Sequence, residues 1–324
     1  MILKKLLILC CVALTSLAGP VPSSFLDFSD LQPLIDYLQK FGFLSKDGNL
    51  NFDTIRQSIK DFQNSAGLKP SGILDLQTEV MLNTGRCGVI VNNFALSNNG
   101  WSHTDLTYRI EKYPDPRKLA KYEVDETIEK AFKFWADVTP LTFTKQPTGI
   151  VDIVIIFAEG EHGDGYAFDG PKGTLAHAFE PYPGVGTVDS IYGDAHFDGA
   201  EDFTINEDDG TNLLQVATHE IGHSLGLSHS NNREAVMYSY FGGYDDDFGL
   251  SPDDIAGIQK LYGPNLVQPT NGPDSTLPTL PTRKNAENNL TPTLPRGPGE
   301  TTTTQQPRPP TRVTGVTRPP TRIT

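Results

Sequence analysis

An eleven-residue pattern, His-Glu-x-x-His-x-x-Gly-x-x-His from His219 to His229, constrains the fold of this chain most strongly. On a helix, His219 and His223 project from one face, so both imidazoles can reach one metal ion. Gly226 permits the positive φ that ends the helix and turns the chain back, which brings His229 to the same ion. Glu220 is placed to take a proton from a metal-bound water. Three protein ligands leave a fourth position open, which is typical of a catalytic zinc.

Chance explains this pattern poorly. At the histidine content of this chain, 7 in 324 residues, the short His-Glu-x-x-His arises by chance in about one such sequence in a hundred. The added glycine and third histidine lower this to about one in ten thousand. We therefore favour a metal site over the alternative, in which the histidines are satisfied in a core or on the surface.

Residues 1–18 are expected to be a secretory signal. Lys4 and Lys5 precede an apolar run, and small residues before Gly19 offer a cleavage site. The alternative is a buried N-terminal helix, but a helix that is apolar on all sides has no polar face for water. Removal of the signal would leave Cys87 as the single cysteine, so the secreted protein would have no internal disulfide.

The next two regions are predicted to fold. In residues 19–93 apolar side chains recur at helical spacing three times, which predicts a small three-helix prodomain. The positions are Leu31, Leu34, Ile35 and Leu38, then Ile55, Ile59 and Phe62, then Leu76 and Val80. Residues 94–264 have mixed patterns, with strands expected at 106–110, 141–145 and 150–157 and helices at 124–135, at 212–225 and after Ser251. The Gly- and Asp-rich stretch 160–203 has little periodicity, so we expect something else to organise it.

Residues 265–324 hold 12 Pro and 15 Thr and no aromatic residue, so we expect a disordered tail. The tail is too short for a hemopexin-like domain, and its polar end predicts no lipid anchor. No long apolar run follows the signal, so we expect no membrane span. The net charge of −14 argues against nucleic acid as a partner and suits a protein that binds calcium.

The histidine motif, Ser230 after it and Ala235-Val236-Met237-Tyr238 together resemble the zinc-binding helix and Met-turn of the matrix metalloproteinases, the matrixins within the metzincins. The resemblance extends from the prodomain to Gly263. It implies an α+β fold with a twisted, mostly parallel sheet, an antiparallel edge strand, an active-site helix and the Met-turn, preceded by the helical prodomain. It also implies a zinc endopeptidase with Glu220 as general base.

The resemblance further implies a structural zinc and calcium. The structural zinc would be held by three nitrogens and one oxygen, a closed tetrahedron, from His162, Asp164, His177 and His196. A calcium ion would be held by side-chain and main-chain oxygens of Asp169, Gly170, Lys172, Thr174, Asp198 and Glu201. A second calcium would use Asp152, Gly184, Gly186 and Asp194. The alternative for these acids is a solvated surface.

Cys87 lies at the junction of the two modules, and the resemblance implies that it is a cysteine switch. A thiolate is a strong zinc ligand, so its docking would displace the reactive water and hold the enzyme latent. The alternative is a buried bystander thiol. The family's flanking Pro and Asp are replaced by Gly85 and Val91, so we expect a looser switch. Arg86 is expected to pair with a carboxylate of the cleft.

We therefore expect a secreted zinc endopeptidase, made as a zymogen, that hydrolyses extracellular, matrix-type proteins. The substrate would lie extended along the strand near 174–179 and add a strand to the sheet. The resemblance also implies protein inhibitors in the cleft and a monomer. The alternative is a catalytically inactive, metzincin-like binding protein, or a prodomain that binds wall polysaccharide. Glu220 argues against an inactive copy, which would be free to lose the one motif residue that is not a ligand.

Overall fold

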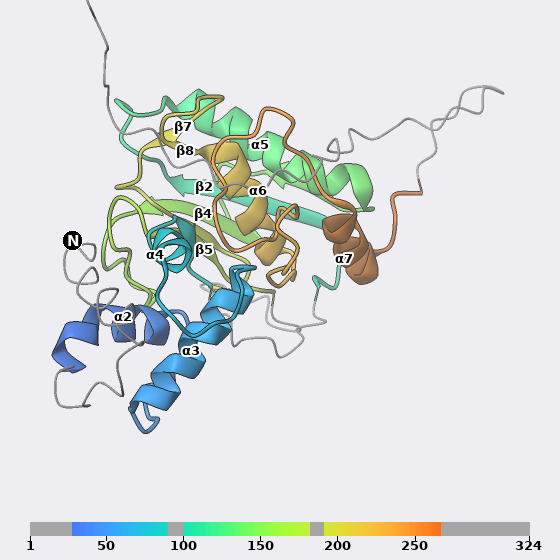
Figure 1. The fold of residues 1–324 in the computed structure, drawn as a ribbon. Coiled ribbons are helices and arrows are strands. Elements are labelled where there is room, and N and C mark those ends of the chain that lie inside the picture. Colours follow the sequence, from blue (N-terminus) through green and yellow to red (C-terminus); the bar gives the residue numbers. More distant parts are fainter. Residues whose placement is uncertain (1–27, 90–99, 182–190, 267–324) are drawn as a thin grey trace, which may run out of the picture. The chain divides into compact units, whose positions relative to one another are not determined.

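The computed structural model describes residues 28–89, 100–181 and 191–266 (Figure 1). The expected signal, the expected tail from residue 267 onward, Val91, and the two calcium-site glycines Gly184 and Gly186 lie outside the described residues. In the described part, no helix is both long and apolar enough to cross a membrane.

The prodomain contains the three expected helices, α2 (Phe28–Lys40), α3 (Phe52–Ser65) and α4 (Leu76–Leu82). Asn51 caps α3 and Asp75 caps α4, because each side chain accepts hydrogen bonds from the first amides of its helix. The first two helices bury the apolar faces that their spacing predicts. The helix α4 is present as predicted, but Leu76 and Val80 do not mark its buried face: Leu76 is 64% exposed and Val80 40% exposed, and the helix buries Thr78 and Leu82 instead.

The region after the prodomain helices is built on a sheet with the strand order β1-β5-β6-β4-β2-β3. Its strands are β1 (Arg86–Cys87), β2 (Asp105–Lys112), β3 (Thr142–Lys145), β4 (Ile153–Ala158), β5 (Thr174–Ala178) and β6 (Ala195–Asp198). All neighbours are parallel except β5 and β6, which confirms the mostly parallel sheet with an antiparallel strand toward one edge. We expected β5 at the edge of the sheet. β1, which directly follows the prodomain helices in the chain, pairs with β5 and forms the edge instead.

Three helices accompany the sheet: α5 (Lys121–Val138), α6 (Leu213–Ser224) and α7 (Pro252–Tyr262). Figure 1 shows α5 and α6 along the sheet, and α6 packs against both α5 and β5. Trp135 of α5 is fully buried and donates a hydrogen bond of 3.0 Å to the carbonyl of Thr218 in α6. This contact fixes where α6 lies relative to α5, and therefore where the side chains of α6 face β5.

The stretch 160–203 has more regular structure than its sequence predicts. It contains β5, β6 and the first residue of β7 (Phe203–Thr204), which pairs with β8 (Thr211–Asn212). The predicted strand 150–157 is also shifted, because Ile150 is 69% exposed and β4 begins only at Ile153.

Candidate active site and metal centres

Helix α6 carries the first half of the histidine motif. Asn212 accepts a hydrogen bond from the Gln215 amide and so fixes the start of the helix. His219, Glu220 and His223 are all buried. The helix ends at Ser224, and Gly226 has a φ of 95°, which favours glycine and turns the chain back as its place in the motif predicts.

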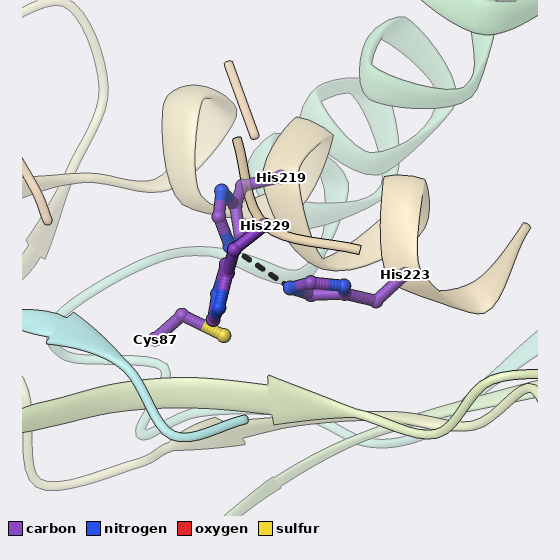
Figure 2. Close-up of side chains that lie close together, drawn as sticks. All are labelled: Cys87, His219, His223 and His229. Atoms are coloured by element: carbon purple, nitrogen blue, oxygen red, sulfur yellow. Dashed lines mark hydrogen bonds between the residues drawn. The ribbon is translucent and has the colours of Figure 1, made fainter. Parts of the chain in front are cut away.

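The three imidazoles of the motif converge. Figure 2 shows His219, His223 and His229 turned toward one point, with the Cys87 sulfur facing them. One ligand atom from each of these four residues lies within 4.8 Å of the others. The structure therefore brings together all four residues that the sequence predicts for the catalytic zinc.

Hydrogen bonds fix which ring nitrogens face this point. Nδ1 of His219 lies 2.6 Å from the Val236 carbonyl, and Nδ1 of His223 lies 2.7 Å from the Leu227 carbonyl. A carbonyl oxygen can only accept, so both Nδ1 atoms donate and both Nε2 atoms carry lone pairs.

The distance between these lone pairs indicates that a cation binds between them. The two Nε2 atoms lie 3.1 Å apart, too close for two acceptors without a cation between them. Tetrahedral zinc with bonds of about 2.0–2.1 Å would hold them about 3.3 Å apart. Nε2 of His229 is buried and has no hydrogen-bond partner within the described ranges. The donor set therefore fits zinc.

Burial keeps these histidines neutral. It lowers the pKa of His219 to about 4 and that of His223 to about 3, and it lowers the pKa of His229 as well. Neighbouring imidazoles lower the pKa of His223 and His229 further. All three rings therefore offer a free lone pair at neutral pH, which metal coordination requires.

Cys87 contacts the predicted general base. Its sulfur lies 3.6 Å from Oε2 of Glu220 and accepts a hydrogen bond of 3.4 Å from the Val89 amide. Burial raises the pKa of the Cys87 thiol well above its ordinary value, and Glu220 raises it further. Burial also raises the pKa of Glu220 to about 8, against a smaller opposing effect of the hydrogen bond to Cys87. A divalent cation among the histidines would favour the thiolate.

The second predicted zinc set also converges. Nε2 of His162, Nε2 of His177 and Nδ1 of His196 lie 2.7, 2.7 and 2.8 Å from Oδ2 of Asp164. Nδ1 of His162 lies 2.8 Å from the Gly160 carbonyl, so its Nε2 faces the carboxylate with a lone pair. A lone pair of His162 that faces a carboxylate oxygen, with two further imidazoles beside it, again fits a bound cation with three nitrogens and one oxygen.

The electrostatics of this cluster suit a metal as well. Burial lowers the pKa of His177 to about 4 and also lowers the pKa of His196. For Asp164, burial opposes ionisation, but hydrogen bonds from the Tyr166 amide and from the two histidines outweigh it and lower the pKa to about 2. The carboxylate is therefore charged and the imidazoles neutral at pH 7.

The first predicted calcium set lies around the start of β5, which includes Thr174, and the end of β6, which includes Asp198. Asp198 accepts hydrogen bonds from the amides of Gly170 and Ala200, and Glu201 accepts one of 2.6 Å from the amide of Lys172. Burial raises the pKa of Asp198 and raises that of Glu201 to about 7, and neighbouring carboxylates add to both. Among the described residues these acids do not form a cluster as tight as the two histidine clusters.

Two further contacts of this calcium set bear on its stability. Asp169, whose carboxylate accepts from the Thr174 amide, also forms an ion pair of 3.0 Å with Lys40 of α2. Lys172 has a φ of 70°, a backbone conformation that favours glycine, so the position is strained.

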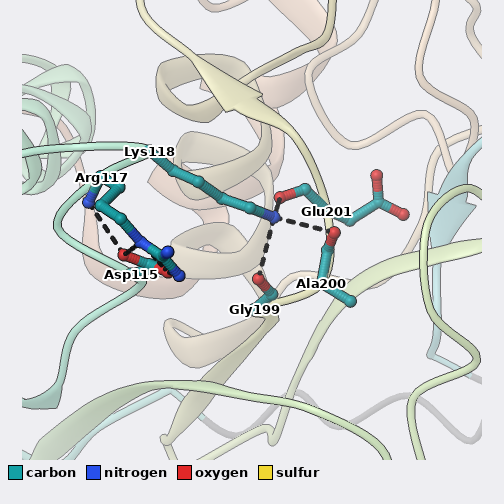
Figure 3. Close-up of polar contacts among 6 residues, drawn as sticks. All are labelled: Asp115, Arg117, Lys118, Gly199, Ala200 and Glu201. Atoms are coloured by element: carbon teal, nitrogen blue, oxygen red, sulfur yellow. Dashed lines mark hydrogen bonds and ion pairs between the residues drawn. The ribbon is translucent and has the colours of Figure 1, made fainter. Parts of the chain in front are cut away.

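Lys118 is a residue that sequence reasoning missed. Figure 3 shows its ammonium among three carbonyl oxygens, and it donates to Gly199, Ala200 and Glu201 at 3.4, 3.0 and 2.8 Å. A lysine in a Pro- and Lys-containing loop gives no sequence signal for such a contact. Its effect is to hold the loop that carries Glu201.

The second predicted calcium set is only partly described, because its two glycines lie outside the described residues. Asp152 accepts hydrogen bonds of 2.7 Å from the amide and hydroxyl of Thr107, and Asp194 accepts one of 2.8 Å from the Val154 amide. Burial raises the pKa of Asp194 to about 7. Asp152 also pairs with His103, the one histidine outside both clusters.

The predicted Met-turn lies beneath α6. A Cβ atom on Gly222 would lie 2.3 Å from the Met237 sulfur, so only glycine allows this approach. Asp254, at the start of α7, holds the turn by accepting from the amides of Val236 and Met237. The sequence does not indicate this role for Asp254, because an acid in the first turn of a helix is common without one.

Two family models and several known proteins match the chain. The Matrixin model matches residues 100–263, and a peptidoglycan binding domain model matches residues 29–82. Interstitial collagenase from Sus scrofa is 45% identical over 285 residues, which cover 85% of this chain and 58% of that protein. Matrilysin from Homo sapiens is 43% identical over 267 residues, which cover 80% of this chain and 97% of matrilysin. Macrophage metalloelastase from Rattus norvegicus is 45% identical over 234 residues, with 69% and 48% covered.

The chain thus spans nearly the whole of matrilysin but little more than half of the collagenase. The Matrixin match contains both histidine clusters except Cys87, and the second match falls on the three prodomain helices. The similarity to matrilysin and the Matrixin match both agree with the resemblance that the histidine motif suggested. The chain therefore belongs to the matrixin family, the matrix metalloproteinases, and is a zinc-binding member of it.

Proposed function

We propose that this chain is a secreted zinc endopeptidase, made as a latent zymogen, that hydrolyses extracellular proteins. His219, His223 and His229 would hold the catalytic zinc, and Cys87 would complete its coordination in the latent form. The observation that carries the proposal is the meeting of three neutral imidazoles and one thiol beside Glu220. Together these residues supply a metal site, a general base and a thiol that would block both.

The chemistry is divided between the metal and Glu220. A zinc ion at this site would polarise the scissile carbonyl and lower the pKa of water. The carboxylate of Glu220 would accept the proton of the attacking water and deliver it to the leaving amine. With Cys87 in place, burial raises the pKa of Glu220 to about 8, so this carboxyl can hold a proton near neutral pH.

The binding path for a substrate is occupied by the chain's own β1 segment. The amides of Arg86 and Gly88 donate to the carbonyls of Gly173 and Ala176 along β5. On the other side, the amide of Cys87 donates to the Ser239 carbonyl. An extended substrate would use these same main-chain groups after β1 leaves, which supports a peptide rather than a small molecule as ligand.

The structural roles are proposals on the same basis. His162, Asp164, His177 and His196 would hold a second, structural zinc. Calcium would bind at the Asp169, Gly170, Lys172, Thr174, Asp198 and Glu201 set, because its buried acids need a cation to be charged at neutral pH. The two calcium-site glycines and Asp152 with Asp194 would hold a second calcium.

The partners are proposed by analogy with relatives. The names interstitial collagenase and matrilysin belong to proteins of the same family, and for this chain we infer extracellular matrix-type proteins as substrates. Protein inhibitors would enter the same path along β5. The domain limits 1–18, 19–93, 94–264 and 265–324 remain predictions, as does the monomer.

The test is hydrolysis of a quenched fluorescent peptide by the prodomain-free enzyme, with and without a zinc chelator. Glu220→Ala should keep both zinc ions, measured by elemental analysis, and lower turnover by about 10²–10⁴-fold, because only the base is removed. Near-normal turnover in the variant would refute the mechanism. An inactive parent that holds zinc would instead support the alternative, a binding protein with a matrixin fold.

A further inference from the structure

The guanidinium of Arg86 is enclosed by aromatic rings rather than by a carboxylate. Its central carbon lies 3.9 Å from the ring centre of Phe41, 4.8 Å from that of Tyr240 and 5.7 Å from that of Phe43. Nη1 donates to the hydroxyls of Tyr37 and Tyr240 at 3.4 and 3.2 Å. We call these four aromatic residues the Arg86 cage.

This arrangement overturns the expected ion pair. Arg86 is 1% exposed and forms no ion pair with a carboxylate within the described ranges, and its Nη2 has no hydrogen-bond partner there. Burial of a charge without compensation is strongly unfavourable. The ring faces and the two hydroxyls of the cage are the compensation that the structure offers.

The cage belongs to two modules. Tyr37 and Phe41 lie in or just after α2, with Phe43 close behind, whereas Tyr240 follows the Met-turn of the catalytic region. Tyr240 is buried within the apolar cluster of the prodomain, where its ring meets that of Phe62 edge to face at 6.2 Å. Neither module can close the cage alone, so the cage exists only while the two are docked.

The cage is also coupled to the thiol. Arg86 immediately precedes Cys87, and its Nε donates to the Cys87 carbonyl at 3.2 Å. The backbone on both sides is held as well, because the amide of Phe241 donates to the carbonyl of Gly85. A fixed guanidinium therefore fixes the direction in which the neighbouring thiol points.

We propose that the Arg86 cage is the device that positions Cys87 over the histidines, and that Tyr240 and Phe41 are its positioning residues. This inference rests on the proposed zymogen function and names the contact that sets how firmly latency holds. Because the contact is a buried cation against aromatic faces, its strength should depend little on salt, unlike that of an exposed ion pair. Opening the cage would release Arg86 and the thiol together.

The test is the rate at which iodoacetamide alkylates Cys87 in the full chain, loaded with zinc and carrying Glu220→Ala to prevent self-cleavage. Phe41→Leu keeps an apolar side chain but removes the closest ring, so the rate should rise about 10- to 30-fold. Tyr37→Phe removes only a hydroxyl and should raise it a few-fold. Ile59→Val is the matched control, because it trims the same apolar cluster outside the cage.

A double-mutant cycle separates positioning from general loosening of the prodomain. In an Arg86→Met background, Phe41→Leu should change the rate less than about threefold, because the cation that the ring holds is gone. An equal effect with and without Arg86, or an effect of Ile59→Val as large as that of Phe41→Leu, would overturn the cage. Parent Cys87 that reacts as fast as in the denatured chain would instead refute the zymogen proposal itself.

Discussion

The sulfur of Cys87 lies 3.6 Å from Oε2 of Glu220, so the last residue of β1 contacts the predicted base in α6. Both groups are buried, and Glu220 raises the pKa of the Cys87 thiol, whereas the hydrogen bond from Cys87 lowers the pKa of Glu220 against the larger effect of burial. One contact thus links the prodomain to the two parts of the proposed chemistry, the metal position and the base. A thiol at this point would therefore suppress hydrolysis in two ways: it would occupy the fourth coordination position of the metal, and it would crowd Glu220.

The first prediction follows from that contact. Cys87→Ser should make the full-length chain active and prone to shed its prodomain, because a neutral hydroxyl is a much weaker zinc ligand than a thiolate. Peptide hydrolysis and the size of the chain on a denaturing gel measure both effects. The double variant Cys87→Ser with Glu220→Ala is the control and should remain full-length and inactive. A single variant as silent as the parent would contradict the switch.

The second prediction is that one histidine cluster supports hydrolysis and the other supports the stability of the fold. The parent should hold two zinc ions per chain by elemental analysis. His229→Ala should lose one zinc and peptide hydrolysis, with a small change in Tm, because its site lies on a preformed helix and turn. His196→Ala should also lose one zinc but lower Tm by more than about 5 °C, because metal binding there orders the stretch 160–203. Equal Tm losses would contradict this division of roles.

The active helix could be predicted from the sequence because its signals are local. Four-residue spacing, a turn glycine and a polar start at Asn212 are all encoded within about eighteen residues. The strands β5 and β6 could not be predicted in the same way. Every residue of both strands is buried, so neither shows the alternation that marks a strand with one wet face. The resemblance alone led us to expect a strand near 174–179, and it did not predict β6.

Contacts between segments that are far apart in the sequence could not be predicted either. Arg86 and Tyr240 are 154 positions apart, and nothing near either residue indicates a cation on a ring. The apolar spacing in α4 does not mark its buried face, for a related reason. Thr78 is drawn inward by a hydrogen bond from Gln63, 15 positions away, and this turns Leu76 and Val80 outward. A seven-residue helix has too little apolar surface to resist such a contact.

A third prediction concerns calcium and Lys118. Lys118→Met removes the ammonium that holds three carbonyls of the loop 199–201, so the loop should depend more on calcium for its order. The fall in Tm on adding a calcium chelator should be larger in this variant than in the parent. Lys133→Met, which removes an exposed pair on α5, is the control and should respond as the parent does. An equal response of Lys118→Met and the control would count against both the clamp and the calcium set.

The last prediction uses the pH dependence of stability at Asp194. Burial raises the pKa of this carboxyl from 3.8 to about 7, and the nearby Glu111 adds to the effect while Arg109 opposes it. A raised pKa means that the folded chain binds more protons than the unfolded chain, so this group's contribution to stability is lost as the pH rises from about 4 to about 7.

Asp194→Asn keeps an acceptor for the Val154 amide but carries no charge. In a calcium chelator the variant should match the parent in Tm near pH 4 and exceed it at pH 8, where the parent must bury a carboxylate. Excess calcium should reverse the order at pH 8 if Asp194 is a ligand, because only the parent then gains binding energy. A variant that is less stable than the parent at pH 8 in chelator would show that the Asp194 charge is already compensated by the protein. A variant that stays more stable in calcium would remove Asp194 from the proposed second site.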